Sequence, residues 1–231
     1  MDRKSENYIE CKKDKSYDFN FTNKYKFTTR LALNDESLEV VDRAKLLGVL
    51  LTDDLKWDAN TELLVKKANS RMELLRRVAS FNPSVEDKRN LYILYVRSIL
   101  EQSCVVWNSS LTMENSNDLE RVQKAAVRII LGNKYENYEQ ALEEVNLQKL
   151  TERRSELCLK FAQKCTQSEK TEKMFPLKKN NHDMEVRNPE KFIVKHANTE
   201  RLKNCAILNM QRMLNGSILI KRNPDSTYSF I

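Results

Sequence analysis

The hydrophobic pattern of the chain changes from a two-residue to a 3.6-residue repeat part-way along its length. Over residues 25–33, aromatic, β-branched and leucine residues alternate with polar ones, as is typical of a half-buried strand. Asn34-Asp35 is a turn signal, and residues 38–41 follow as a short returning strand, so we expect a hairpin. Residues 46–51 are apolar on both faces and predict a third strand, which ends at Thr52-Asp53-Asp54.

Beyond this region the apolar positions recur at helical spacing. Asp58 is a candidate N-cap for the first long helix, and Ser84 with Asp87 resembles a capping box that opens a strongly apolar helix through residue 104. Ser116 opens a third helix that ends before Gly132. Further helices are expected over residues 138–145, 148–166 and 199–214, with an irregular basic loop at 175–189. The predicted fold class is therefore mainly α with a small N-terminal antiparallel β element (α+β), arranged as a helical bundle.

Composition supports this fold class and adds a charge asymmetry. Only 3 Gly and 4 Pro occur in 231 residues, which favours long helices over turn-rich β architecture. The formal net charge is +7, but residues 160–222 hold 14 Lys and Arg against 6 Asp and Glu, a net charge of +8. A basic segment of this kind suits a phosphate backbone, and a solvated basic tail is the equally weighted alternative.

Composition also indicates the cellular compartment in which the protein is expected. Five Cys at scattered spacings, without an apolar signal segment after Met1, predict free thiols in a reducing compartment and an intracellular protein. The longest apolar run covers six residues, 46–51, far below the ~20 that a membrane span needs, so no membrane association is expected.

Six short segments occur in a characteristic order. They are AKLLGV (44–49), DLKW (54–57), YVRSILE (95–101), VW (106–107), LERVQKAAVR (119–128) and RR (153–154). In order and spacing this set resembles the C-terminal region of reverse transcriptases from non-LTR (LINE-type, jockey-like) retrotransposons. The resemblance covers roughly residues 25–215 and rests on the set rather than on any single motif.

The resemblance implies a division of the chain into four parts. Residues 1–24 would be a ragged N-terminus at the end of a palm-like segment, and 25–57 a β-hairpin with a primer-grip-like strand at Leu46, Leu47, Gly48 and Val49. Residues 58–167 would form a helical domain like the thumb and connection, and 168–231 a basic region with one helix. The family's catalytic aspartates lie upstream of the matching region, so we expect no catalytic residues here although the parent family is an RNA-directed DNA polymerase.

Two rows of cations are the candidate nucleic-acid contacts. Arg121, Lys124 and Arg128 fall opposite an apolar face of the third helix. On the helix over 148–166, Arg153, Lys160 and Lys164 run beside a predicted apolar stripe. That stripe contains Leu150, Leu157 and Phe161, with Cys158 and Cys165 on the same side as small core residues. A solvated polar face explains either row equally well.

No metal or cofactor is expected. Asp53-Asp54 follows the primer-grip-like strand instead of preceding it, so we interpret the pair as a strand terminator and helix-capping cluster rather than a metal site. The Cys and His residues match no structural zinc spacing; they are Cys158, Cys165, His182, His196 and Cys205. Two functions remain open: a non-catalytic retrotransposon fragment that binds RNA or DNA, and an orphan helical protein–protein interaction domain.

Overall fold

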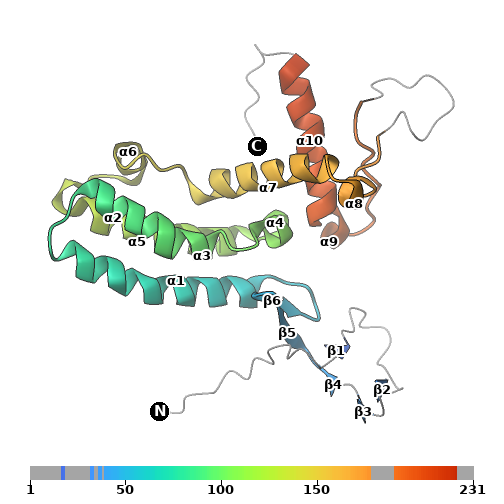
Figure 1. The fold of residues 1–231 in the computed structure, drawn as a ribbon, viewed down its shortest axis with the longest axis horizontal. Coiled ribbons are helices and arrows are strands. Elements are labelled where there is room, and N and C mark those ends of the chain that lie inside the picture. The colour runs from blue at the N-terminus through green and yellow to red at the C-terminus, as the bar shows by residue number, and fades with distance from the viewer. Residues whose placement is uncertain (1–16, 19–31, 34–35, 38, 178–189, 223–231) are drawn as a thin grey trace. The chain divides into compact units, whose positions relative to one another are not determined.

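The computed structural model describes residues 17–18, 32–33, 36–37, 39–177 and 190–222 (Figure 1). The chain divides into two compact units. Unit 1 comprises residues 1–100 and 111–135, and unit 2 comprises residues 101–110 and 136–231. Most described residues are helical, and the small strands all lie on the N-terminal side. The predicted fold class, mainly α with a small N-terminal antiparallel β element, is therefore confirmed.

A hairpin of β5 (Arg43–Leu46) and β6 (Val49–Thr52) leads into the first long helix. Its turn is Leu47-Gly48, and both residues have positive φ, 48° and 86°, as the tight turns of two-residue hairpins require. The prediction of one continuous strand over 46–51 is wrong, because Gly48 lets this apolar run reverse in its middle. Val49 and Leu50 still enter the core as a strand, while Leu46 and Leu47 are exposed.

Four two-residue strands precede this hairpin. β2 (Ala32–Leu33) pairs antiparallel with β3 (Glu36–Ser37), and β4 (Glu39–Val40) pairs parallel with β1 (Tyr17–Asp18). Residues 39–40 therefore do not return along β2 as predicted, since the partner of β2 lies nearer in sequence. Most of the predicted strand at 25–33 lies outside the described residues.

The helices of unit 1 pack side by side through one apolar face each. α1 (Asp58–Ala79) lies against α5 (Met113–Leu131) and against the segment formed by α2 (Val85–Leu91), the π-helical η1 (Tyr92–Arg97) and α3 (Ser98–Leu100) (Figure 1). A short 3₁₀ turn, η3 (Gly132–Lys134), follows α5. The fully buried side chains recur at helical spacing, as an amphipathic helix requires. They are Leu64, Ala68, Met72 and Leu75 on α1, and Leu119, Ala126, Val127 and Ile130 on α5.

Of the three helix starts predicted from the sequence, the one at Ser84 is confirmed, and those at Asp58 and Ser116 are wrong. The Ser84 hydroxyl accepts a hydrogen bond from the Asp87 N–H at 3.0 Å, which confirms that cap. α1 has no side-chain cap, and Asp58 instead accepts a 2.7 Å bond from the Asn115 amide. α5 begins before Ser116, because Thr112 accepts a 3.1 Å bond from the Asn115 N–H.

The predicted helix from residue 84 to 104 is not continuous. It passes through the π-helical segment η1 and breaks after Leu100, where Ser103 takes a positive φ of 52°. α4 (Cys104–Trp107) and the 3₁₀ turn η2 (Asn108–Ser110) follow and belong to unit 2. The break therefore lies where the chain passes from one unit to the other.

Unit 2 is built around α7 (Leu150–Thr166), which contacts α4 and α10 (Ala206–Arg222). Shorter helices complete it: α6 (Tyr138–Glu144), α8 (Glu169–Glu172) and α9 (Glu200–Lys203). A buried cluster joins α7 to α10 through Ala162, Cys165, Phe175, Met210 and Leu214. The last predicted helix, 199–214, is in fact two helices, with Asn204 and Cys205 between them.

The predicted basic loop at 175–189 and the expectation about membrane spans can be compared only with the described residues. Residues 178–189 of the predicted basic loop lie outside the described residues, while Leu177 and Phe192 at its two ends form an antiparallel bridge. Among the helices of the described ranges, none has the length and apolar character to cross a membrane.

Candidate nucleic-acid interface

The primer-grip-like residues form the tip of the β5–β6 hairpin. Leu46 and Val49 face each other across the turn, and Leu47 is 92% exposed. The hairpin is tied to α1 by the Leu50 N–H, which donates a 3.0 Å hydrogen bond to the buried Asn60 Oδ1. The tip therefore presents an apolar side chain on a firmly anchored base, in unit 1.

Asp53 and Asp54 form the turn between this hairpin and α1. Asp54 accepts bonds from the Thr52 hydroxyl at 2.7 Å and from the Lys56 N–H at 3.1 Å. The Thr52 hydroxyl, followed by the bond from the Lys56 N–H, holds the pKa of Asp54 below its usual range. The pair ends the strand as predicted, but neither carboxylate caps α1, so that part of the interpretation is wrong.

The cation row on α5 is exposed as predicted, but neighbouring side chains engage at least two of its members. Arg121 forms an ion pair with Asp118, one turn before it. Arg128 lies over the ring of Tyr135, 5.1 Å from the ring centroid, as a cation–π contact. Lys124 is exposed between them. A phosphate approaching this row would have to displace the Asp118 carboxylate, which weakens the row as a binding surface.

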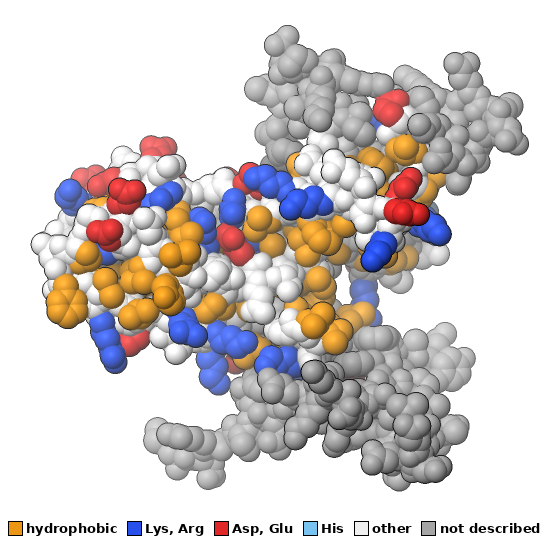
Figure 2. All heavy atoms as spheres, in the orientation of Figure 1, with side chains coloured by type: hydrophobic (Ala, Val, Ile, Leu, Met, Phe, Trp, Pro, Cys, Tyr) orange, Lys and Arg blue, Asp and Glu red, His pale blue; other side chains and the backbone are white. Residues whose placement is uncertain are grey.

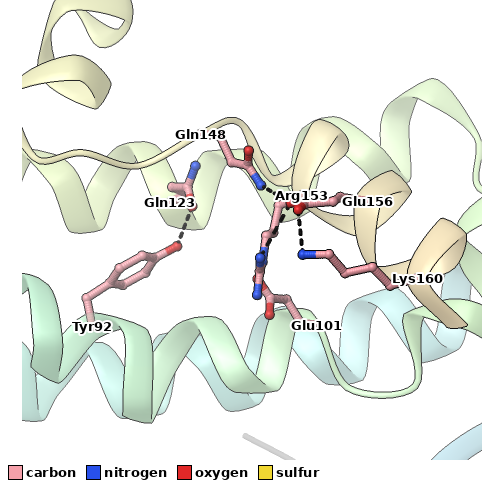
Figure 3. A network of polar contacts seen from close by, with 7 residues as sticks. All are labelled: Tyr92, Glu101, Gln123, Gln148, Arg153, Glu156 and Lys160. Atoms are coloured by element: carbon pink, nitrogen blue, oxygen red, sulfur yellow. Dashed lines mark hydrogen bonds and ion pairs between the residues drawn. The ribbon is translucent and has the colours of Figure 1, made fainter. Parts of the chain in front are cut away.

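The cation row on α7 belongs to an ion-pair network in unit 2 (Figure 3). Arg153 pairs with Glu101 at 3.2 Å and with Glu156 at 3.5 Å, and Lys160 pairs with Glu156 at 2.6 Å. The bond from Lys160 and a 3.0 Å bond from Gln148 lower the pKa of Glu156 to about 2. Two cations here are thus balanced by two carboxylates, whereas Lys164 forms no ion pair with any described residue.

Beside this network, the surface of α7 is hollowed. A groove of about 550 Å³, here called the α7 groove, runs between α7 and the segment at the start of α4. It is lined by Glu101, Ser103, Cys104, Val105, Leu157, Lys160, Phe161, Gln163, Lys164 and Gln167. Figure 2 shows Lys and Arg side chains gathered over α7 beside hydrophobic ones. The groove thus combines two lysines, two amides and one aromatic ring with one carboxylate, that of Glu101, which is paired with Arg153.

Phe161 is the member of the α7 groove that sequence reasoning misplaced. It was predicted on a buried stripe with Leu150 and Leu157, but its side chain is 43% exposed. The buried face of α7 instead includes Arg154, which is fully buried. Its guanidinium is accommodated because Nε donates a 2.9 Å bond to Asn108 and the group lies 5.9 Å from the Trp107 ring centroid.

The remaining candidate residues do not come together as a metal site. Cys158 and Cys165 are buried as expected for small core residues. His182 lies outside the described residues, and within the described ranges no three or more Cys, His, Asp or Glu side chains are placed to share a metal ion.

Comparison of the whole chain with protein-family models, with curated proteins and with solved structures finds no match in any of the three.

Proposed function

We propose that this chain is a non-catalytic nucleic-acid-binding protein, related to the region of LINE-type reverse transcriptases beyond their catalytic aspartates, and that the α7 groove holds a single-stranded segment. The observation that carries the proposal is the exposed Phe161 between Lys160 and Lys164 in one groove. Exposed aromatic rings beside cations are the usual elements of single-strand binding, because bases stack on the ring while phosphates approach the cations.

The charged side chains of the groove indicate where the phosphates of a bound strand would lie. Lys164 has no ion pair in the described part of the chain and is the natural phosphate contact. Lys160 is held by Glu156, so it contributes to a phosphate only by leaving or sharing that carboxylate. Gln163 and Gln167 carry amides that donate to phosphate or base edges without adding charge. Affinity should therefore depend on stacking at Phe161 as much as on charge.

The proposal is tested by measuring the binding of the full chain to a short fluorescent single-stranded RNA or DNA. Phe161→Ala should weaken binding by about 5- to 150-fold, since one base stack contributes about 1–3 kcal/mol. Lys164→Glu should weaken it too, and more strongly at low salt. Lys195→Glu is the matched control, because Lys195 is exposed in the same unit, outside the groove, and its change alters the net charge equally.

Equal loss in Lys164→Glu and Lys195→Glu, with no loss in Phe161→Ala, would indicate attraction by net charge alone and contradict the groove. Binding that survives both groove substitutions but is lost on reversing Arg121, Lys124 and Arg128 together would assign the contact to α5 instead. Since all of these side chains are exposed or half-exposed, the variants should fold normally.

Exposed apolar residues in unit 1 favour the protein–protein alternative. Leu47, Phe81 and Leu94 are 92%, 85% and 69% exposed. Large apolar side chains on a surface mark interaction sites when they are contiguous; Leu47 precedes the 22-residue helix α1 and Phe81 follows it, so the two would be separate contacts. A chain that binds no nucleic acid at low salt, but runs as a dimer that dissociates in Leu47→Ser or Leu94→Ser, would support this alternative over the first.

A further inference from the structure

Two thiols meet inside unit 2 where α4 packs on α7. Cys104 and Cys158 are buried, with 3% and 6% of their surfaces exposed. The Cys158 Sγ lies 3.9 Å from the carbonyl oxygen of Cys104, so the two residues are in direct contact where α4 packs on α7. The other described cysteines, Cys165 and Cys205, are free thiols as well.

A buried cation lies beside this pair. Arg154, on the same helix as Cys158, is fully buried and fixed by its bond to Asn108. Hydrogen bonding from Cys104, with added support from the Arg154 charge and the Asn108 side chain, lowers the pKa of the Cys158 thiol against the opposing effect of burial. The bond to Cys158 and burial raise the pKa of Cys104, with a smaller contribution from the Glu101 charge. Cys158 is therefore the more readily deprotonated thiol of the pair.

Cys104 and Cys158 also line hollows that small molecules can enter. Cys104 lines the α7 groove of about 550 Å³. Cys158 lines a separate space of about 50 Å³ beside Asn108 and Met210, large enough for a molecule the size of water or hydrogen peroxide. Burial thus shields the pair from large reagents without isolating it from a small neutral oxidant.

We propose that Cys104 and Cys158 are an oxidisable thiol pair that hydrogen peroxide closes to a disulfide between α4 and α7. The Cys158 thiolate attacks one peroxide oxygen, so that an S–O bond forms, the O–O bond breaks and the departing hydroxide takes up a proton as water. Cys104 sulfur then attacks Cys158 sulfur; the S–S bond forms, the S–O bond breaks and the Cys104 proton leaves with the second hydroxide as water. Two thiols are oxidised and one peroxide is reduced to two waters.

The site is independent of nucleic-acid binding and is tested without it. The full chain is treated with hydrogen peroxide and then unfolded in denaturant, free thiols are alkylated, and the tryptic peptides are analysed by mass spectrometry. We expect a linked pair of peptides containing Cys104 and Cys158, lighter by about 2 Da than the two reduced peptides, while the Cys165 peptide remains alkylated. In Cys104→Ser, a sulfenic-acid trap added with the denaturant should label Cys158; in Cys158→Ser, Cys104 should remain alkylatable.

Cys165→Ser is the matched control, since Cys165 is a buried thiol of the same helix and its loss should leave the linked peptide unchanged. Oxidation of Cys165 or Cys205 at peroxide concentrations that leave Cys104 and Cys158 alkylatable would overturn the proposal. So would trapping on Cys104 in Cys158→Ser without trapping on Cys158 in Cys104→Ser. Circular dichroism of each serine variant separates these outcomes from unfolding.

Discussion

One buried hydrogen bond holds the π-helical segment of unit 1 to α5. The Tyr92 hydroxyl donates a 2.8 Å bond to Gln123 Oε1, and both side chains are fully buried (Figure 3). Tyr92→Phe removes only the hydroxyl oxygen and leaves the ring in place. The change therefore measures the hydrogen bond rather than a cavity. We expect Tyr92→Phe to destabilise unit 1.

The expected loss in the free energy of unfolding follows from the burial of the two groups and the geometry of their hydrogen bond. Removing one partner of a buried neutral pair costs about 1–3 kcal/mol, because the remaining polar group loses its partner without regaining water. Gln123→Leu should cost a similar amount, since it leaves the Tyr92 hydroxyl without this acceptor. The double variant, Tyr92→Phe with Gln123→Leu, removes both groups and should cost less than the sum by about 1–2 kcal/mol.

The two tryptophans allow the unfolding of each unit to be followed separately by fluorescence. Trp57 is in unit 1 and Trp107 in unit 2, and the chain has no other tryptophan. In a Trp107→Phe background, the fluorescence of the buried indole of Trp57 reports the urea unfolding of unit 1. With a slope of about 2 kcal/mol per molar urea, the midpoint of Tyr92→Phe should fall by about 0.5–1.5 M.

The reasoning would be refuted by either of two results. A midpoint shift below about 0.15 M would mean that the hydroxyl makes no net contribution, in conflict with its burial. Strictly additive effects of Tyr92→Phe and Gln123→Leu would mean that the two groups do not interact. Tyr92→Leu serves as the packing control, because it removes the ring as well and should cost more than Tyr92→Phe.

Three further predictions use the same unfolding assay or a pH titration. Gly132→Ala should destabilise unit 1 by about 1–2 kcal/mol, because φ is +58° although no atom lies within 4 Å of the added Cβ; an unchanged midpoint would contradict that backbone geometry. Thr112→Ala should cost about 1 kcal/mol through loss of the α5 cap, and Thr112→Ser should restore most of it, whereas equal losses in both would argue against the cap. The lowered pKa of Glu156 means that its contribution to stability is present above the ordinary value of 4.5 and is lost as pH falls toward about 2; an NMR titration of Glu156 near 4.5, or the same acid profile in Glu156→Gln, would contradict this.

The sequence was a good guide to the helices, because burial repeats every three or four residues along them. The fully buried side chains of α1 and α5 recur every three or four residues, at the helical spacing seen in the sequence. The Ser84 cap was found for the same local reason: donor and acceptor are three residues apart. Features of this kind depend on neighbours in sequence, and a single sequence contains them.

The turn at Leu47-Gly48 was missed although it is local, because an apolar run containing a glycine is compatible with a strand or with a turn. Other features depend on residues that are far apart in sequence. Arg154 is buried because Asn108 and Trp107 come from another helix to receive it, and this shifts the buried stripe of α7 and exposes Phe161. The pairing of Arg153 with Glu101 spans 52 residues and left the α7 row less positive than its sequence suggested.

The most direct test of the proposed function is the salt dependence of binding by the unmodified chain. A labelled single-stranded RNA is titrated with the full chain at several salt concentrations, and the logarithm of the affinity is plotted against the logarithm of the salt concentration. The account predicts a straight decline of about 0.7 per phosphate neutralised, and a shallower decline in Lys164→Glu. Absence of binding at the lowest salt concentration, or an affinity that does not change with salt, would contradict it.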